Sequence, residues 1–264
     1  MKMRAHPEGA FCWVGLATSD PAAAQVFYTQ LFDWEGEVLA AGAAGTFTIL
    51  RRGGEDVAIL YRQTEQARAA AARPHWTTYI SVEDAETTAA RAAELGGAQV
   101  FRAPFDVVDA GRVAAIRDPT GAILSLWQPR ARIGATVVNE VGALCWNELA
   151  TTDVARAKSF FGELVGWTYQ TDAAGYTTIA NPRRANGGMR EQAMDQRDRP
   201  PAWLPHFEVE DSEVVARRAL QLGARGAAPI RESPLGRLAV ITDPKGAEFA
   251  VLEPRRTNEQ RADG

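Results

Sequence analysis

The sequence predicts an α+β fold built from four β-α-β-β-β modules, grouped two and two into tandem domains. The first observation behind this prediction is that CWVGLATSD (residues 12–20) returns as CWNELATTD (residues 145–153), 133 positions later. The same offset relates Phe27 to Phe160, Leu31 to Leu164 and Trp34 to Trp167. The second is that four aspartates have a leucine eleven residues on, namely Asp20, Asp84, Asp153 and Asp211. The third is a turn of the form Asp-Pro-x-Gly before the last strand of each half.

The first module begins with a strand over residues 11–17. Asp20 then serves as a helix N-cap, and Pro21 occupies the first helical position, where a missing N–H has no cost. The helix is predicted to end near Phe32. Residues 63–73 form a polar connecting segment that is compatible with a helix. The remaining strands of the module are predicted over residues 37–39, 46–50 and 57–61.

The second module repeats this order with a strand over residues 77–82, a cap at Asp84 and a helix to Leu95. The glycine pair that follows Leu95 is typical of a helix C-terminus. The later strands of this module are predicted over residues 99–102, 112–117 and 122–127. The second half of the chain carries the same pattern, with Trp203 in place of Trp76.

The repeat also predicts the domain boundaries. The first domain covers residues 9–130, with modules 9–62 and 74–130, and residues 131–141 form a linker. The second domain covers residues 142–256, with modules 142–192 and 201–256, and residues 257–264 form a polar tail.

Composition excludes several classes of function. A net charge of −4 and a pI near 5.5 do not suit a phosphate-binding surface, so we expect no nucleic-acid partner. No apolar run approaches the roughly 20 residues that span a bilayer, and the N-terminus lacks the apolar core of a secretion signal. We therefore expect a cytoplasmic protein with no membrane partner. Cys12 and Cys145 occupy equivalent positions, and we expect two buried free thiols rather than a disulfide.

Two kinds of motif carry a family resemblance: the helices FYTQLFDW and FFGELVGW behind their caps, and the turns DPTGA and DPKGA. Together they resemble the vicinal oxygen chelate superfamily, which includes glyoxalase I, extradiol dioxygenases and bleomycin-resistance proteins. The resemblance covers residues 9–254. The phrases DAGR, WNEL and IGATVVNEVG are more specifically similar to an actinobacterial subgroup of tandem glyoxalase-like proteins, which includes a mycobacterial culture-filtrate antigen and proteins labelled hydroxylase. The resemblance implies that each domain is a curled sheet around a cavity, with the helices outside.

In this superfamily a metal ion lies in the cavity, and the resemblance implies where its ligands would stand. They lie seven residues before each capping aspartate and four residues after the turn glycine, which gives Trp13, Thr77, Trp146, Leu204, Ser125 and Ala250. None of these is a histidine or a glutamate, and tryptophan, leucine and alanine supply no ligand atom to a divalent cation. We therefore expect no catalytic metal at these positions and no cofactor.

Strand alternation predicts which side chains face each cavity, because residues two apart in a strand share a face. The first cavity should be lined by Trp13, Gly15, Ala17, His75, Thr77, Tyr79, Ser81, Ile123, Ser125 and Trp127. The second should be lined by Trp146, Glu148, Leu204, His206, Glu208, Glu248, Ala250 and Leu252.

The first cavity is thus predicted to be an aromatic box of Trp13, Tyr79 and Trp127, which suits a planar apolar ligand. The alternative is that these rings simply fill a small core. In the second cavity, His206 is placed to meet Glu148 or Glu208, and a histidine beside a carboxylate is suited to moving protons near neutral pH. The alternative here is a structural hydrogen bond or a solvent-facing strand edge.

From these positions we predict His206, Glu148 and Tyr79 as catalytic residues. The predicted substrate contacts are Trp13, His75, Trp127, Trp146, Glu208 and Arg112. Arg112 and Arg237 stand at matching positions after a glycine, and bracing of a loop is the alternative duty for both.

Three functions are compatible with these residues. The first is a metal-independent enzyme of secondary metabolism, a lyase or isomerase that dehydrates, cyclises or rearranges an aromatic or polyketide-like substrate by acid–base chemistry. The second is a binding protein that sequesters a drug or metabolite. The third is a metal-dependent glyoxalase or dioxygenase with relocated ligands, such as His75 with Glu148 or His206 with Glu208. The sequence leaves open the substrate, the working cavity, and whether the protein is a monomer or a homodimer.

Overall fold

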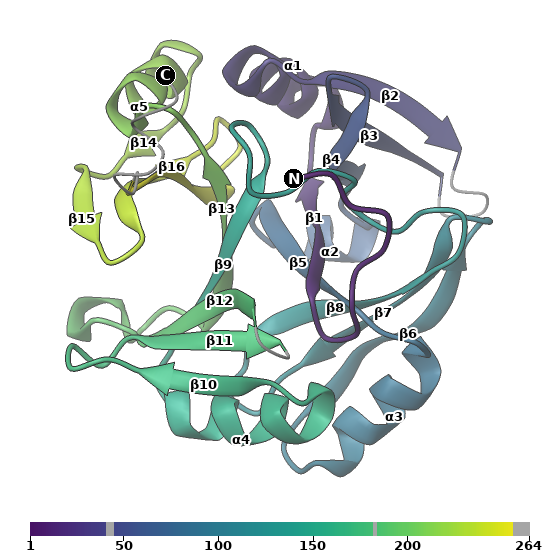
Figure 1. The fold of residues 1–264 in the computed structure, drawn as a ribbon. Helices are drawn as coiled ribbons and strands as arrows, with labels where there is room; N and C mark the ends of the chain where they lie inside the picture. The colour runs from purple at the N-terminus through teal and green to yellow at the C-terminus, as the bar shows by residue number, and fades with distance from the viewer. Residues whose placement is uncertain (41–44, 182–183, 256–264) are drawn as a thin grey trace.

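The computed structural model describes residues 1–40, 45–181 and 184–255, which form two β-sheets standing back to back (Figure 1). The first sheet has eight strands in the order β2-β3-β4-β1-β5-β8-β7-β6. The second follows the same plan, with nine strands in the order β10-β11-β12-β9-β13-β17-β16-β14 and β15 beside β16. The predicted α+β class, with two modules to each curled sheet, is confirmed.

The elements of the first sheet and its helices are β1 (Phe11–Thr18), α1 (Pro21–Phe32), β2 (Glu35–Ala40), β3 (Thr46–Arg52), β4 (Glu55–Arg62), α2 (Glu65–Ala69), β5 (His75–Ser81), α3 (Ala85–Glu94), β6 (Gln99–Val107), β7 (Gly111–Arg117) and β8 (Ile123–Pro129).

Those of the second are β9 (Leu144–Thr151), α4 (Val154–Val165), β10 (Thr168–Thr171), β11 (Thr177–Asn181), β12 (Arg184–Glu191), a 3-10 turn (Met194–Gln196), β13 (Ala202–Glu208), α5 (Ser212–Gln221), β14 (Gly226–Ala227), β15 (Arg231–Ser233), β16 (Gly236–Thr242) and β17 (Glu248–Pro254).

Each of the four predicted aspartates caps a helix. The carboxylates of Asp20, Asp84, Asp153 and Asp211 accept hydrogen bonds from backbone N–H groups in the first helical turn. These bonds satisfy donors that a helix start leaves open. β6 is longer than predicted because it continues through Pro104 by shifts in its register against β7. The short strands β14 and β15 have too few residues to show a period in the sequence.

The first strands of the two modules lie side by side in each sheet. β1 pairs with β5, and β9 pairs with β13, in both cases antiparallel. Trp146 is opposite His206, and Glu148 is opposite Leu204. Side chains from both modules therefore share one concave face, as the alternation predicts.

The helices α1, α3, α4 and α5 lie on the convex faces, between the backs of the two sheets, with α1 near α5 and α3 near α4 (Figure 1). Two matched hydrogen bonds link the domains there. Trp34 Nε1 donates to the carbonyl of Gly142 at 2.7 Å, and Trp167 Nε1 donates to the carbonyl of Gly9 at 2.7 Å. Each tryptophan thus fixes the residue just before the first strand of the other domain.

Tyr28 on α1 ties the first domain to a turn of the second. Its hydroxyl accepts a hydrogen bond from Trp76 Nε1 at 3.0 Å and donates one to Asp243 Oδ2 at 3.0 Å. All three side chains are buried. One hydroxyl therefore satisfies an indole donor and a carboxylate acceptor, as buried polar groups require.

The equivalent contact on the other side of the molecule lacks this hydroxyl. Phe161 stands 133 residues after Tyr28 and packs against Trp203 with ring centroids 5.8 Å apart. Trp203 Nε1 and Asp118 Oδ2 are buried and have no hydrogen-bond partner within the part of the chain that the structure describes. Burial also raises the pKa of the Asp118 carboxyl.

Within the described ranges, no helix combines the length and the apolar character needed to cross a bilayer.

We predict that Phe161→Tyr raises the free energy of unfolding by about 1 kcal/mol, because the new hydroxyl satisfies two buried groups. Tyr28→Phe should lower it by about 2 kcal/mol, because it leaves the same two kinds of group unpaired. Urea unfolding measures both changes. Phe160→Tyr is the control, since it adds the same hydroxyl one position earlier on α4, and it should destabilise. If Phe161→Tyr destabilises as much as Phe160→Tyr, the interpretation of this contact is wrong.

Candidate functional site

The aromatic box of the first concave face is closed by the chain itself. Trp13, Tyr79 and Trp127 are buried, and the Trp13 and Trp127 ring centroids lie 5.4 Å apart, edge to face. The linker and the N-terminus complete the same cluster through Ala135, Val138, Met1 and Met3. The three rings are therefore packed as core, which is the second of the two interpretations that the sequence leaves open.

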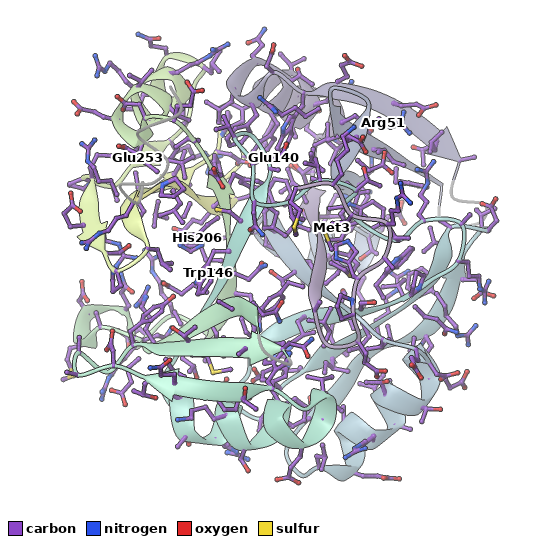
Figure 2. The ribbon with its side chains drawn as sticks, in the orientation of Figure 1. Met3, Arg51, Glu140, Trp146, His206 and Glu253 are labelled. Atoms are coloured by element: carbon purple, nitrogen blue, oxygen red, sulfur yellow. The ribbon has the colours of Figure 1, made fainter. Side chains whose placement is uncertain are left out.

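Backbone hydrogen bonds hold the linker over this end of the sheet. Ala135 N–H donates to the carbonyl of Cys12 at 2.8 Å, and Trp127 Nε1 donates to the carbonyl of Arg132 at 3.1 Å. Met3 N–H donates to the carbonyl of Thr136 at 2.8 Å. Met3 is drawn beside β1 in Figure 2. The N-terminus and the linker thus run together across the first domain.

The two concave faces carry different side chains at equivalent positions. Gly15, Tyr79 and Tyr61 of the first sheet correspond in register to Glu148, His206 and Arg190 of the second. A Cβ on Gly15 would lie 3.1 Å from ring carbons of both Tyr61 and Tyr79. Neutral rings therefore fill this place in the first domain. Tyr79 keeps its proton there, because burial raises the pKa of its hydroxyl well above the ordinary value. Three ionisable groups occupy it in the second.

Glu148 is the buried charge of the second concave face. Its side chain is 4% exposed, and Oε1 accepts a hydrogen bond from Arg190 Nε at 2.7 Å. Arg231 Nη2 is a second, looser partner at 3.7 Å from the same oxygen. Two guanidinium groups therefore face one carboxylate.

Tyr176 connects Glu148 to the indole of Trp146. The Tyr176 hydroxyl accepts a hydrogen bond from Trp146 Nε1 at 2.9 Å. It also lies near the Glu148 carboxylate, whose negative charge adds to burial in raising the pKa of Tyr176. Gly188 on β12 makes this possible, because a Cβ there would stand 2.1 Å from the Tyr176 hydroxyl oxygen. Any larger residue at that position would displace the tyrosine.

His206 completes the group from β13. Its ring is fully buried, and Nδ1 lies 3.1 Å from the carbonyl of Leu204. Because a carbonyl only accepts, Nδ1 carries the proton of the neutral ring and Nε2 keeps its lone pair. Nε2 is buried and has no hydrogen-bond partner among the described residues. In Figure 2, His206 and Trp146 lie together on the inner side of the second sheet.

The two titratable groups are held in opposite states. Burial lowers the pKa of His206, and the charge of Glu148 only partly opposes this effect, so the imidazole is neutral at pH 7. Burial by itself would raise the pKa of Glu148, but the positive groups around it, His206 when protonated and Arg190, lower that pKa. The folded protein thus holds the neutral imidazole of His206 beside the ionised carboxylate of Glu148.

A cavity of about 780 Å³ lies at the end of β13 that carries Glu208, and it is also lined by Arg237 and Glu253. Burial raises the pKa of Glu208. Glu208 follows His206 by two residues on β13, but His206 and Glu148 are not among the residues that line the cavity. Of the side chains at Glu148, those of Arg190 and Arg231 are 26% and 48% exposed.

The structure separates the other predicted residues from this group. His75 is exposed at the start of β5, with Nδ1 at 3.0 Å from the carbonyl of Arg73. Arg112 forms ion pairs with Glu86 at 2.9 Å and with Asp106 at 3.0 Å, which is the bracing duty named as its alternative.

Three residues of the group are not predicted from the sequence: Tyr176, Arg190 and Arg231. Arg190 lies opposite Ala150 on β9, a register that the structure shows and the sequence does not. Arg231 comes from a strand of three residues, which is too short to show alternation.

Comparison with known proteins identifies the relatives of this chain. Residues 10–126 match the Glyoxalase/Bleomycin resistance protein/Dioxygenase superfamily, and residues 144–252 match a glyoxalase-like domain family. The putative glyoxylase CFP32 of Mycobacterium tuberculosis is 38% identical over 259 residues, which cover 96% of this chain and 98% of that protein. The anthracycline biosynthesis protein DnrV of Streptomyces peucetius is 31% identical over 264 residues, which cover 94% of both.

Solved structures share the fold at low identity. The Mn(II)-bound glyoxalase from Novosphingobium aromaticivorans superposes with a TM-score of 0.63 at 14% identity, covering 94% of this chain and 83% of that one. The 2,3-dioxygenase LapB from Pseudomonas sp. KL28 gives a TM-score of 0.63 at 13% identity, covering 92% of each chain.

The residues of this chain do not fit the cation that such folds hold. The six expected ligand positions carry Trp13, Thr77, Trp146, Leu204, Ser125 and Ala250. Over residues 1–40, 45–181 and 184–255, no group of three or more His, Cys, Asp or Glu side chains is placed to bind a metal. A relocated site would need about three protein ligands. Among the described residues, neither His75 with Glu148 nor His206 with Glu208 belongs to such a group. His75 and Glu148 also lie in different sheets.

We predict that acid destabilises the protein through its buried histidines. The pKa of His206 is lower in the folded protein than its ordinary 6.5, so the unfolded chain binds the proton first as the pH falls. Stability should therefore decrease below about pH 6.5, by up to about 1.4 kcal/mol per pH unit for one histidine. Urea unfolding between pH 7 and pH 5 should show a flatter dependence for His206→Gln than for the wild type.

His6 and Glu208 serve as internal controls. Burial lowers the pKa of His6, so His6→Gln should also flatten the dependence. The raised pKa of Glu208 acts in the opposite sense, and Glu208→Gln should steepen it. Equal slopes for wild type and His206→Gln would show that folding does not lower the pKa of His206.

Proposed function

Because the chain belongs to the Glyoxalase/Bleomycin resistance protein/Dioxygenase superfamily, we propose that it is a small-molecule enzyme of secondary metabolism. Its working site is the concave face of the second sheet. The relatives named for anthracycline biosynthesis support this class of metabolism. An aromatic or polyketide-like substrate suits a face whose wall is the Trp146 indole.

One observation carries the proposal: His206 presents an unpaired Nε2 lone pair beside the carboxylate of Glu148. An unpaired acceptor at full burial costs free energy, and such sites persist where a ligand supplies the missing partner. A neutral imidazole is a suitable general base near pH 7. Glu148 stabilises the imidazolium that forms when Nε2 takes a proton.

The reaction that these groups support is loss of water from a β-hydroxyketone. Nε2 of His206 removes the proton from the carbon next to the carbonyl, which leaves an enolate. The bond between the β-carbon and its oxygen then breaks, and the imidazolium returns the proton to the departing hydroxide. The products are an enone and water, and His206 is neutral again. The positive charge of Arg190 stabilises the negative charge on the enolate oxygen.

Tyr176 and Trp146 have positioning duties in this scheme. Tyr176 keeps its proton because burial raises the pKa of its hydroxyl. It accepts the hydrogen bond of the Trp146 indole and lies near Glu148. Since no cation ligands stand at the six superfamily positions, the proposed reaction uses acid–base groups of the protein and no metal.

A binding protein that sequesters a metabolite is the second candidate, and the 780 Å³ cavity favours it. That cavity has the size of a small-molecule site. Sequestration needs no titrating residue. A wild-type protein that binds an aryl β-hydroxyketone without converting it would support this candidate.

We predict that His206→Gln and Glu148→Gln each lower kcat for dehydration of an aryl β-hydroxyketone by about 10²-fold or more. The loss follows because one variant removes the base and the other removes the charge that stabilises its protonated form. Mass spectrometry that detects loss of one water measures the reaction. Kd for the ketone should change little in both variants.

His75→Gln is the matched control, since it changes a histidine that lies outside the second concave face, and it should keep wild-type kcat. Urea unfolding at pH 7 verifies that each variant is folded. Full activity of folded His206→Gln would rule out this mechanism.

A further inference from the structure

We propose that the substrate of this site carries a carboxylate and that Arg231 is the residue that recognises it. The inference rests on the proposed function, because it concerns the same concave face. It concerns which substrates the site binds, whereas the acid–base scheme concerns the reaction that the site catalyses.

The charges around Glu148 do not cancel. Arg190 and Arg231 each carry one positive charge, Glu148 carries one negative charge, and His206 is neutral at pH 7. The group therefore has one positive charge in excess. A buried or half-buried site with such an excess is complementary to a monoanion.

The two arginines differ in how closely they contact Glu148. Arg190 forms a close ion pair, with its Nε 2.7 Å from Glu148 Oε1 and its side chain 26% exposed. Arg231 is loosely held, with Nη2 at 3.7 Å from Glu148 and 48% of its side chain exposed. A distance of 3.7 Å is too long for a hydrogen bond. The Arg231 fork thus keeps donors for a planar acceptor, and a carboxylate matches that geometry with two parallel bonds.

The charges around the cavity fix the orientation of the ligand. The glutamates that line the cavity outnumber its arginines, so its surface is less favourable to an anion than Arg231 is; they are Glu208, Glu210, Glu232 and Glu253 against Arg237 and Arg255. β15 places Arg231 opposite Leu238 of β16, next to the buried group. A carboxylate at Arg231 leaves the rest of the molecule to lie against Trp146 and to donate a hydroxyl to His206 Nε2. One ligand then supplies a hydrogen-bond donor to His206 Nε2 and an acceptor to the Arg231 guanidinium.

Isothermal titration calorimetry with three probes of one shape tests this inference. Naphthoate, naphthamide and naphthylammonium differ in the charge of one substituent. We expect wild-type protein to bind naphthoate at least ten times more tightly than naphthamide, and naphthylammonium more weakly than naphthoate. Arg231→Gln should raise the Kd of naphthoate at least tenfold and leave that of naphthamide nearly unchanged.

Arg217→Gln is the matched control, because Arg217 is 63% exposed on α5, pairs with Glu213 and faces no part of the site. It should bind naphthoate like the wild type. Arg231→Lys keeps the charge but loses the fork, and it should recover part of the affinity. Equal Kd values for naphthoate in the wild type and in Arg231→Gln would overturn the inference, and so would a wild type that binds none of the probes.

The same variants separate this inference from the proposed function. If naphthoate binding depends on Arg231 while His206→Gln keeps full dehydration activity, the recognition stands and the acid–base scheme fails. If His206→Gln abolishes activity while Arg231→Gln leaves the Kd of naphthoate unchanged, the acid–base scheme stands and the proposed role of Arg231 is wrong.

Discussion

Glu148 brings a negative charge into a face of the second sheet where 4% of its side chain meets solvent. A carboxylate in that position costs several kcal/mol in lost hydration unless partners surround it. Arg190 on β12, Tyr176 before β11 and Arg231 on β15 supply those partners from three parts of the domain. The position of each is therefore constrained by one charge. The glycine at 188 belongs to the same constraint, because it leaves the room that Tyr176 needs.

The tandem repeat places two copies of one fold back to back, so their concave faces open on opposite sides (Figure 1). The copies differ in what fills those faces. In the first domain, glycine and two tyrosines occupy the central positions, and the linker and N-terminus cover the aromatic end. In the second domain, the same positions carry a carboxylate, an imidazole and a guanidinium. One copy is packed as a scaffold, and the other keeps groups suited to chemistry.

The sequence predicts the repeated elements well, because capping aspartates and paired tryptophans are local signals. Alternation also predicts that Trp146, Glu148 and His206 share a face, since period-two patterning survives in β9 and β13. The closure of the first box is not predictable in this way. It depends on residues 1–10 and on the linker, which have no period and lie far in sequence from the rings that they cover. Arg231 is missed for a similar reason, because its strand has three residues.

The central claim is that ligands occupy the second concave face and not the first. Fluorine NMR of protein labelled with fluorotryptophan tests it directly, because the chain has seven tryptophans, with Trp13 and Trp127 in one face and Trp146 in the other. Single Trp→Phe variants assign the resonances. On addition of naphthoate, the account predicts a shift of the Trp146 resonance while those of Trp13 and Trp127 stay in place. A shift of Trp13 and Trp127 with Trp146 unmoved would contradict it.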